Sequence, residues 1–223
     1  HKYYIELVLV TNVGLPLLLG YLFGSALGVF LLAGVLRLVV IHHFTFLINS
    51  LAHIWGSQPY SDTNSSRDSL VLALLTFGEG YHNYHHSFQG DYRNGIRWWH
   101  FDPTKWIITA LAWVGLTSRL KRAPQLHIEK ARLAMQYNHA LRKAAHLQEA
   151  DRWCQHLEER YAQFLVALEE WATFKREWYR SKKDELLATI ERAELKQRYA
   201  ELKRNVKFQR QEWHLLTSQL AAT

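Results

Sequence analysis

Residues 78–88 read Gly-Glu-Gly-Tyr-His-Asn-Tyr-His-His-Ser-Phe, and the rest of the 223-residue chain is organised around them. The three histidines, His82, His85 and His86, stand at positions i, i+3 and i+4, which share one face of a helix. Neutral imidazole is a common nitrogen ligand for transition metals, and three from one face can grip an ion. The alternative is a set of core or solvated histidines. Three within five residues favour a metal-binding helix.

The residues just before these histidines predict close packing. Leu70–Phe77 is an apolar run of helical character, and serines at 65 and 66 are placed to cap its N-terminus. The run leads to Gly78 and Gly80, which lack a side chain and so permit close backbone approach. Glu79 stands between them and has two interpretations. It orients a ligand imidazole from behind, or it is a structural or surface acid.

The N-terminal quarter of the chain is strongly apolar. Between Ile5 and Ile41 the formally charged residues are Glu6 and Arg37. This run is too long for one bilayer crossing, which takes about 20 residues. It divides at a turn near 20–25, which predicts a membrane-embedded helical hairpin over about 5–46, with spans 5–22 and 26–46. The alternative is a buried hairpin of a soluble protein. Glycines at 28 and 34 predict close packing of the second span.

The distribution of charge along the chain predicts the orientation of the hairpin in the membrane. Through Tyr92 there are three Lys/Arg and five Asp/Glu, whereas from Arg93 onward there are twenty-four and fifteen, for a net charge of +7. Two crossings return the chain to the side of the membrane on which it starts. The positive-inside rule then assigns the basic second half of the chain to the cytoplasm. The histidines belong to this side, and we expect them in a helical cap outside the membrane. We interpret the basic excess as attraction to a membrane surface, and we expect no nucleic-acid partner. The single cysteine, Cys154, excludes an internal disulfide.

Further polar residues stand at the end of the second span. Asn49 and His53 are four residues apart and share a helix face. His42 and His43 lie among apolar neighbours and do not share that face cleanly. For these two we favour helix packing or tunnel polarity over metal binding.

Five stretches together resemble a known family. They are Asn49-Ser-Leu-Ala-His53, the turn Gly56-Ser-Gln-Pro59-Tyr60, residues 78–88, Asp91-Tyr-Arg-Asn94 and Trp98-Trp-His-Phe-Asp-Pro-Thr-Lys-Trp106. They resemble the membrane fatty-acid desaturases, and within these the acyl-CoA delta-9 (stearoyl-type) branch. The resemblance covers about residues 1–122.

The resemblance implies O2-dependent introduction of a cis double bond into a saturated acyl chain, carried by CoA or lipid, at a centre of two iron ions. It implies His53, His82, His85 and His86 as direct ligands, with Asn49 approaching iron through a water. Two electrons would come from an external donor, cytochrome b5 or a ferredoxin. Apolar residues of the second span are tunnel candidates, although ordinary helix packing explains them as well: Phe44, Phe46 and Leu47.

The family also has two earlier histidine boxes, of the H-x(3–4)-H and H-x-x-H-H types. A second H-x-x-H-H motif does not occur in the chain, which begins at His1. We therefore expect the C-terminal portion of a longer enzyme, inactive by itself because half a ligand set cannot hold two irons. Two alternatives stay open. One is a non-catalytic, membrane-anchored helical interaction module, and the other is a hydroxylase of the same histidine-box superfamily.

After the histidines, an apolar run that begins at Pro103 and carries two tryptophans predicts an interfacial helix over about 103–117. The basic residues at 119, 121 and 122 suit anionic lipid or the phosphates of an acyl carrier, or form an ordinary solvated run. We set the boundary of the desaturase-like domain here, at 1–122, and assign 123–223 to a helical extension.

The extension contains neither Gly nor Pro after Pro124, which predicts an almost continuous helical content. Apolar residues recur at spacings of three and four, as in coiled coils. The two seams are Leu157, Tyr161, Phe164, Leu168, Trp171 and Trp178, and then Leu195, Tyr199, Leu202, Val206, Trp213, Leu216 and Leu220. Their phase changes near 181–184, where Ser181 is placed as an N-cap. A hairpin that folds there is slightly favoured over one continuous helix that oligomerises. For the role of the extension, self-association and docking of the redox donor stay open as alternatives. The fold class expected for the whole chain is all-α.

Overall fold

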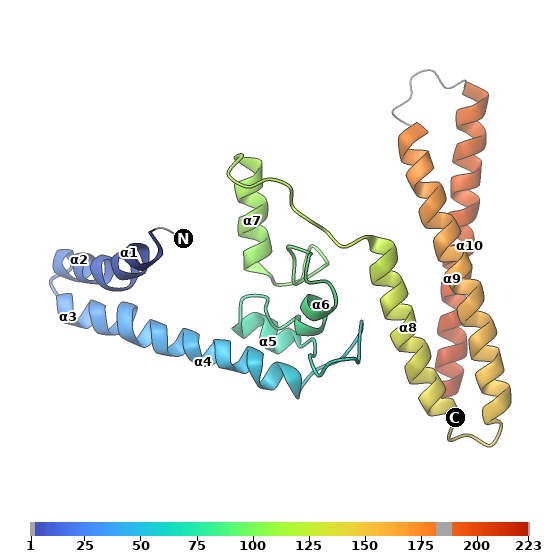
Figure 1. The fold of residues 1–223 in the computed structure, drawn as a ribbon, viewed down its shortest axis with the longest axis horizontal. Coiled ribbons are helices and arrows are strands. Elements are labelled where there is room, and N and C mark those ends of the chain that lie inside the picture. Colours follow the sequence, from blue (N-terminus) through green and yellow to red (C-terminus); the bar gives the residue numbers. More distant parts are fainter. Residues whose placement is uncertain (1–2, 182–188, 223) are drawn as a thin grey trace. The chain divides into compact units, whose positions relative to one another are not determined.

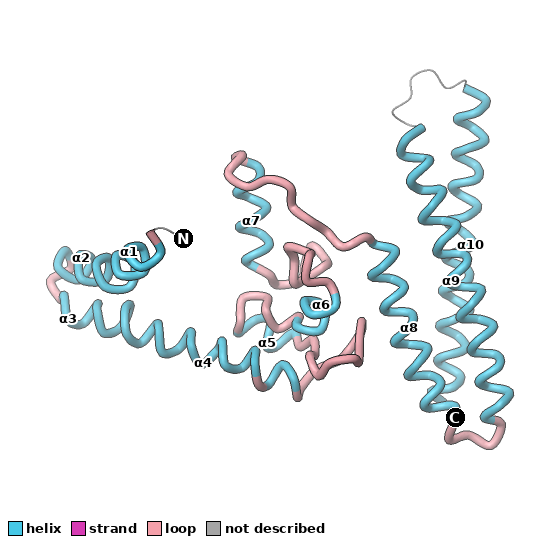
Figure 2. The backbone as a smooth tube through the Cα atoms, in the orientation of Figure 1, coloured by secondary structure: helices cyan, strands magenta, loops and turns pink. Residues whose placement is uncertain are grey.

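The computed structural model describes residues 3–181 and 189–222 (Figure 1). Within these ranges the chain is mostly helical and has no β-strand, as Figure 2 shows. Two isolated bridges join Ser57 to Asp68 and Asp68 to Tyr81. The predicted all-α class is therefore confirmed.

The chain divides into two compact units. The first contains 1–57 and 65–120, and the second contains 58–64 and 121–223. The second unit resumes at residue 121, and the domain assignment 1–122 and 123–223 stays a prediction. The short segment 58–64 was expected in the first domain, but in the structure it packs with the C-terminal helices.

Two long helical segments form a hairpin at the start of the first unit (Figure 1). The first segment runs through α1 (Tyr4–Leu9), η1 (Val10–Gly14) and α2 (Leu15–Leu22). The second runs through α3 (Ala26–Val29), η2 (Phe30–Leu36), α4 (Arg37–Asn49) and η3 (Leu51–His53). Both are long and apolar enough to cross a membrane by length and composition. The helix of the second segment continues past residue 46 to Asn49, where α4 ends; the span bounds of about 5–46 stay a prediction.

The large apolar side chains of the hairpin point mostly outward. Leu22 and Leu27, for example, are 68% and 69% exposed. Exposed apolar surface of this extent is stable only against lipid or against other apolar segments. The apolar surface of the described hairpin is therefore suited to cover by lipid or by other apolar segments.

The two segments approach closely where each makes π-helical turns. Pro16 has no N–H for the carbonyl of Asn12, and the helix ladder shifts into the π-helical η1 just before it. Gly34 of η2 lies against that carbonyl, since a Cβ at 34 would be 3.0 Å from Asn12 O. The guanidinium of Arg37 donates to Asn12 Oδ1, and its Nε donates to the Ala33 carbonyl at 2.8 Å. A charged group within a span thus has acceptors, as such groups require.

Three helices follow in the first unit: α5 (Leu70–Leu75), α6 (His82–Ser87) and α7 (Pro103–Trp113). The N-cap of α5 is Ser69, whose hydroxyl accepts from Leu72 N at 3.4 Å, so the expectation of a cap at 65 or 66 is wrong. α7 ends before the expected 117. Its tryptophans, Trp106 and Trp113, are exposed, as an interfacial helix requires.

The second unit is a bundle of three helices: α8 (Gln125–Ala144), α9 (Ala150–Ser181) and α10 (Thr189–Ala222). Arg160 pairs with Glu212 at 3.0 Å, and the rings of Trp178 and Tyr199 stack with centroids 5.7 Å apart. Because later residues of α9 meet earlier residues of α10, these two helices are antiparallel. They form a hairpin rather than one continuous helix.

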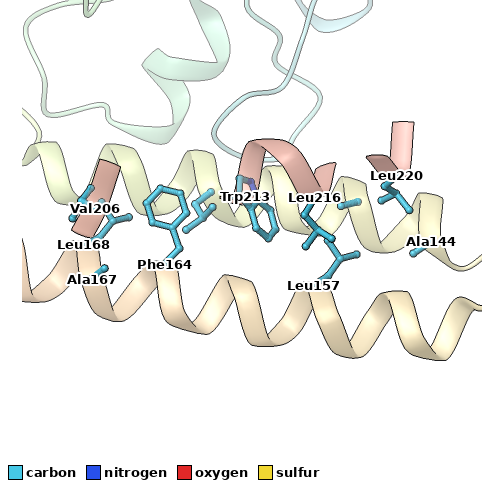
Figure 3. Close-up of a cluster of buried hydrophobic side chains, with 11 residues drawn as sticks. Ala144, Leu157, Phe164, Ala167, Leu168, Val206, Trp213, Leu216 and Leu220 are labelled. Atoms are coloured by element: carbon cyan, nitrogen blue, oxygen red, sulfur yellow. The ribbon is translucent and has the colours of Figure 1, made fainter. Parts of the chain in front are cut away.

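Side chains of all three helices meet in one buried cluster (Figure 3). Its members are Leu133, Ala140, Ala144, Leu157, Phe164, Ala167, Leu168, Val206, Trp213, Leu216 and Leu220. The seam positions predicted for α9 and α10 supply most of them. α8 is an addition that the seam pattern did not single out. Ser181 ends α9, so it is no N-cap, and positions 182–184 lie outside the described residues.

Replacing Leu157 by Ala should strongly destabilise the bundle, because this side chain is fully buried at 0% exposure. We expect a loss of about 2–5 kcal/mol from the cavity and the lost burial. The control on the same helix is Val166→Ala, where Val166 is 55% exposed; its effect should stay within about 0.5 kcal/mol. Hydrogen exchange of the α9 amides measures both. Equal losses in the two variants would contradict the three-helix core.

Candidate metal centre

Three histidine side chains from two elements converge in the first unit. His53 ends η3, and His82 and His86 lie one turn apart on α6. The Nε2 atom of His82 is 3.1 Å from Nε2 of His53 and 3.2 Å from Nε2 of His86. A ligand atom from each residue lies within 4.8 Å of the other two. The structure thus brings together His53 and two of the three histidines of the 78–88 stretch.

These separations fit ligands of a shared ion. Two imidazole nitrogens that each lie about 2.1 Å from one metal are roughly 3.0–3.4 Å apart at angles of about 90–110°. The observed distances of 3.1 and 3.2 Å fall in this interval. Nitrogen donors of this softness suit iron, zinc, copper and nickel. The three residues therefore fit a transition metal, whereas the hard oxygen ligands that calcium and magnesium prefer are not in the group.

The surroundings of His82 and His86 favour the neutral form of these two imidazoles. Burial, helped by the neighbouring His86, His53 and His85, lowers the pKa of His82 to about 4. The pKa of His86 is also lowered, first by burial and then by His85 and His53. Only a neutral imidazole has the lone pair that a metal needs. At neutral pH the cluster is therefore ready to bind a cation.

The second ring nitrogens of two cluster members differ in their surroundings. His53 Nδ1 lies 2.9 Å from the hydroxyl of Ser65, which can fix the orientation of the ring. His82 is 6% exposed, and its Nδ1 is buried without a hydrogen-bond partner. Sequence reasoning missed the contact between Ser65 and His53, because that serine is twelve residues away in a turn-rich connector.

His85 stands beside the three converging nitrogens. Its ring is stacked on that of His82 with centroids 6.2 Å apart, and its Nδ1 lies 3.2 Å from Asn94 Oδ1. Asn94 in turn donates from Nδ2 to Glu79 Oε1 at 3.0 Å. Glu79 therefore reaches a histidine through an intervening amide rather than directly. Asn94 was not proposed as a site residue, although it belongs to a stretch that carried the family resemblance. Ligation by His85 remains a prediction.

A buried carboxylate holds the loop that contains Asn94. Asp102 is 1% exposed, and its Oδ2 accepts from the backbone N–H groups of Asn94 and Gly95, each at 2.9 Å. Its Oδ1 caps α7 by accepting from Lys105 N at 2.9 Å. The ammonium of Lys105 donates to the carbonyls of Gly95 and Arg97 at 2.8 and 2.9 Å. Burial is the main reason that the pKa of Lys105 is lowered.

Further contacts fix the short α6 in place. Asp68 Oδ1 accepts from Tyr84 N at 3.0 Å, close to the start of the helix. The amide of Asn83 donates to the Ser66 carbonyl at 3.0 Å. Tyr84 OH donates to Asp91 Oδ2 at 2.7 Å. A helix of six residues is not stable alone, so these long-range bonds supply what α6 itself lacks.

Gly80 allows α5 to lie directly against the histidine stretch. A Cβ at this position would be 2.1 Å from Ala73 N and 2.4 Å from the carbonyl carbon of Leu72. Both neighbours are backbone atoms of α5, which cannot move aside without disturbing that helix. The predicted close approach at this glycine is therefore confirmed. Gly78 nearby has φ +104 and faces Asp102.

The remaining candidates lie on α4. Asn49 is its last residue and has an exposed side chain, and the hydrogen bonds that connect the described histidines do not include it. Phe46 is 62% exposed, while Phe44 and Leu47 are partly buried. His43 Nδ1 lies 2.7 Å from the Val39 carbonyl of its own helix. The water-mediated role of Asn49 and the tunnel role of the α4 residues stay predictions.

Comparison with known proteins shows which family the chain is similar to. Residues 1–117 match the family described as "Fatty acid desaturase". The chain is 45% identical over 146 residues to "Acyl-CoA desaturase 1" of Saccharomyces cerevisiae, covering 65% of this chain and 29% of the yeast protein. It is 52% identical over 111 residues to "Probable acyl-CoA desaturase" of Schizosaccharomyces pombe, covering 50% and 23%. It is 39% identical over 135 residues to "Stearoyl-CoA desaturase 5" of Homo sapiens, covering 59% and 41%.

The chain thus spans less than half of the length of these relatives. A match of 146 residues also cannot fit within residues 1–122. The similarity therefore continues beyond the boundary at which the sequence pattern suggested that the resemblance ends.

Gly80→Ala should disrupt the centre, because the new methyl group would overlap the α5 backbone. We expect lower thermal stability and loss of bound metal in the purified protein. Gly90→Ala is the matched control, since nothing lies within 4 Å of a Cβ at that position. Thermal unfolding and metal analysis of both variants make the comparison. Normal metal content in the Gly80 variant would contradict the close packing.

In the metal-free protein, the imidazole of His82 should stay neutral down to about pH 4. An unfolded histidine protonates near pH ~6.5, so between these values the unfolded chain binds more protons. The stability contribution is therefore complete above about pH 6.5 and declines as the pH falls toward 4. NMR titration of the ring gives the pKa, and His82→Gln should remove this part of the acid sensitivity. A midpoint at or above 6.5 would be inconsistent with the buried, crowded ring.

Proposed function

Because the chain belongs to the fatty acid desaturase family, an oxidoreductase family, we propose that the protein introduces a cis double bond into a saturated acyl chain, at the delta-9 position. The observation that carries the proposal is the convergence of His53, His82 and His86 at distances suited to a shared metal. The delta-9 position is proposed from the motif flanks that resemble the stearoyl-type branch.

The chemistry explains why a metal centre is needed. Desaturation removes two hydrogens from adjacent methylene groups that no side chain can deprotonate or attack. A pair of iron ions, when bound, would supply the redox chemistry by which O2 oxidises those C–H bonds. In the overall balance, the acyl chain gives up two electrons and two protons. An external donor adds two electrons and solvent two protons, and O2 leaves as two waters.

The residues of this chain would hold and orient that centre. His53, His82 and His86 would bind iron through Nε2, and His85 would be a further ligand. Ser65 fixes the ring of His53. On the other side, Asn94 holds the Nδ1 side of His85 and is itself held by Glu79. Neutral imidazole ligands leave a bound metal electrophilic. Because the pKa of His82 is low, protons would compete little with the metal for its ring nitrogen at neutral pH. The second iron would need ligands beyond the three nitrogens that converge here.

The surroundings would supply substrate, lipid and electrons. We propose a multi-pass membrane protein in which the two apolar segments of the hairpin span the bilayer and the histidine cluster faces the cytoplasm. The acyl chain, as a CoA or lipid ester, would lie along α4 near Phe44, Phe46 and Leu47. Cytochrome b5 or a ferredoxin would deliver the two electrons.

Expression of the full-length protein in a desaturase-deficient host tests this function. We expect cis-monounsaturated acyl chains, and bound iron in the purified protein. His82→Gln should abolish the product and release iron, because it removes the nitrogen that lies between the other two. His127→Gln, on the exposed surface of α8, is the control that should retain both. Hydroxylated acyl chains in place of olefins would indicate the related hydroxylation and would reject desaturation.

A further inference from the structure

The segments on either side of 58–64 belong to the first unit, which contains the histidine cluster and which we call the histidine scaffold. The segment 58–64 itself packs with the C-terminal bundle. At its centre Tyr60 is buried, with 8% of its surface exposed. Its hydroxyl accepts from Arg132 of α8 at 2.9 Å, and the same guanidinium lies over its ring, 5.4 Å from the centroid. One arginine therefore holds this tyrosine by a hydrogen bond and by a cation–π contact.

A second anchor lies ten residues, or nearly three turns, further along α8. Asp62 forms an ion pair with Arg142 of α8. Ten residues of helix separate the two arginines, about 15 Å along the axis, so the segment is held at two distinct points. The segment also closes on itself, because Gln58 Nε2 donates to the Asn64 carbonyl at 2.6 Å. It is an ordered loop, which we call the 58–64 loop.

Both ends of the 58–64 loop belong to the histidine scaffold. Before it, Ser57 pairs with Asp68 through backbone bonds of 3.0 and 2.7 Å. After it, the hydroxyl of Ser65 lies 2.9 Å from His53 Nδ1. The Ser66 carbonyl accepts from Asn83, next to His82. A constraint on the loop is thus passed along a few covalent bonds to the residue that orients His53.

We propose that α8 acts on the metal centre through the 58–64 loop, with Arg132 and Arg142 as positioning residues for His53. A loop of seven residues between fixed ends has few conformations once Tyr60 and Asp62 are held, so Ser65 keeps its place at His53 Nδ1. Without the two arginines, the loop regains conformational freedom and the ring of His53 loses a defined orientation. The C-terminal extension is then part of the catalytic domain's support. The inference rests on the proposed metal-binding role of His53.

A charge swap between Asp62 and Arg142 tests the proposal in the purified full-length protein. Asp62→Arg and Arg142→Asp each break the pair, and the double variant restores it with reversed sign. Both side chains are partly exposed, at 33% and 67%, so neither change buries a charge. We expect faster hydrogen exchange at 57–68 in each single variant of the metal-free protein, and recovery in the double variant. Binding of Fe²⁺ alone should weaken about tenfold in the single variants, as for other supports of ligand histidines.

Arg152→Asp is the matched control. Arg152 lies in the first turn of α9 and pairs with Glu149, just before that helix, in an exposed i,i+3 ion pair. Breaking this pair should change neither readout. Tyr60→Phe keeps the ring but removes the acceptor for Arg132, and it should accelerate exchange in the loop. Unchanged exchange in both single variants, or weak Fe²⁺ binding that the double variant does not restore, would overturn the proposal. So would faster exchange without any change in Fe²⁺ binding. Because these readouts need no turnover, they stay informative if acyl desaturation itself is not observed.

Discussion

The first unit depends on holding imidazole nitrogens of three histidines within 4.8 Å of one another. His82 lies between His53 and His86, and burial together with these neighbouring rings makes a proton on His82 less favourable. Such crowding costs free energy unless the rings stay neutral and share a cation. The surrounding fold must therefore fix two elements that are far apart in the sequence, the end of η3 and the start of α6. Much of the structure between 50 and 105 serves that requirement.

Three carboxylates do most of this fixing. Asp68 binds the start of α6, Asp91 binds the hydroxyl of Tyr84, and Asp102 gathers the backbone around Asn94. Each accepts N–H or O–H groups that would otherwise be buried without partners, which is costly in a protein interior. Their role is positional, and none of them lies in the group of converging histidine nitrogens. Removing any one would loosen a different side of the centre.

The rest of the chain buries apolar surface in two different ways. The hairpin turns its apolar side chains outward, where lipid or other apolar segments can cover them. The guanidinium of Arg37 in the second segment donates a hydrogen bond to Asn12 in the first. The bundle turns its apolar side chains inward, around Leu157 and Trp213, and keeps its charges on the outside. The 58–64 loop belongs to the bundle by its contacts and to the metal centre by its ends. It is the segment through which we propose that α8 supports the histidine cluster.

Periodicity and composition determined the all-α class, the two apolar segments and the seams of α9 and α10, since these follow from local propensity and spacing. The i, i+3, i+4 spacing likewise identified the histidines. Only the tertiary structure decided that His53 joins His82 and His86 while His85 turns to Asn94. It also decided that the 58–64 loop joins α8. These outcomes depend on hydrogen bonds between residues far apart in the chain, and local patterns carry no information about which distant donor meets which acceptor.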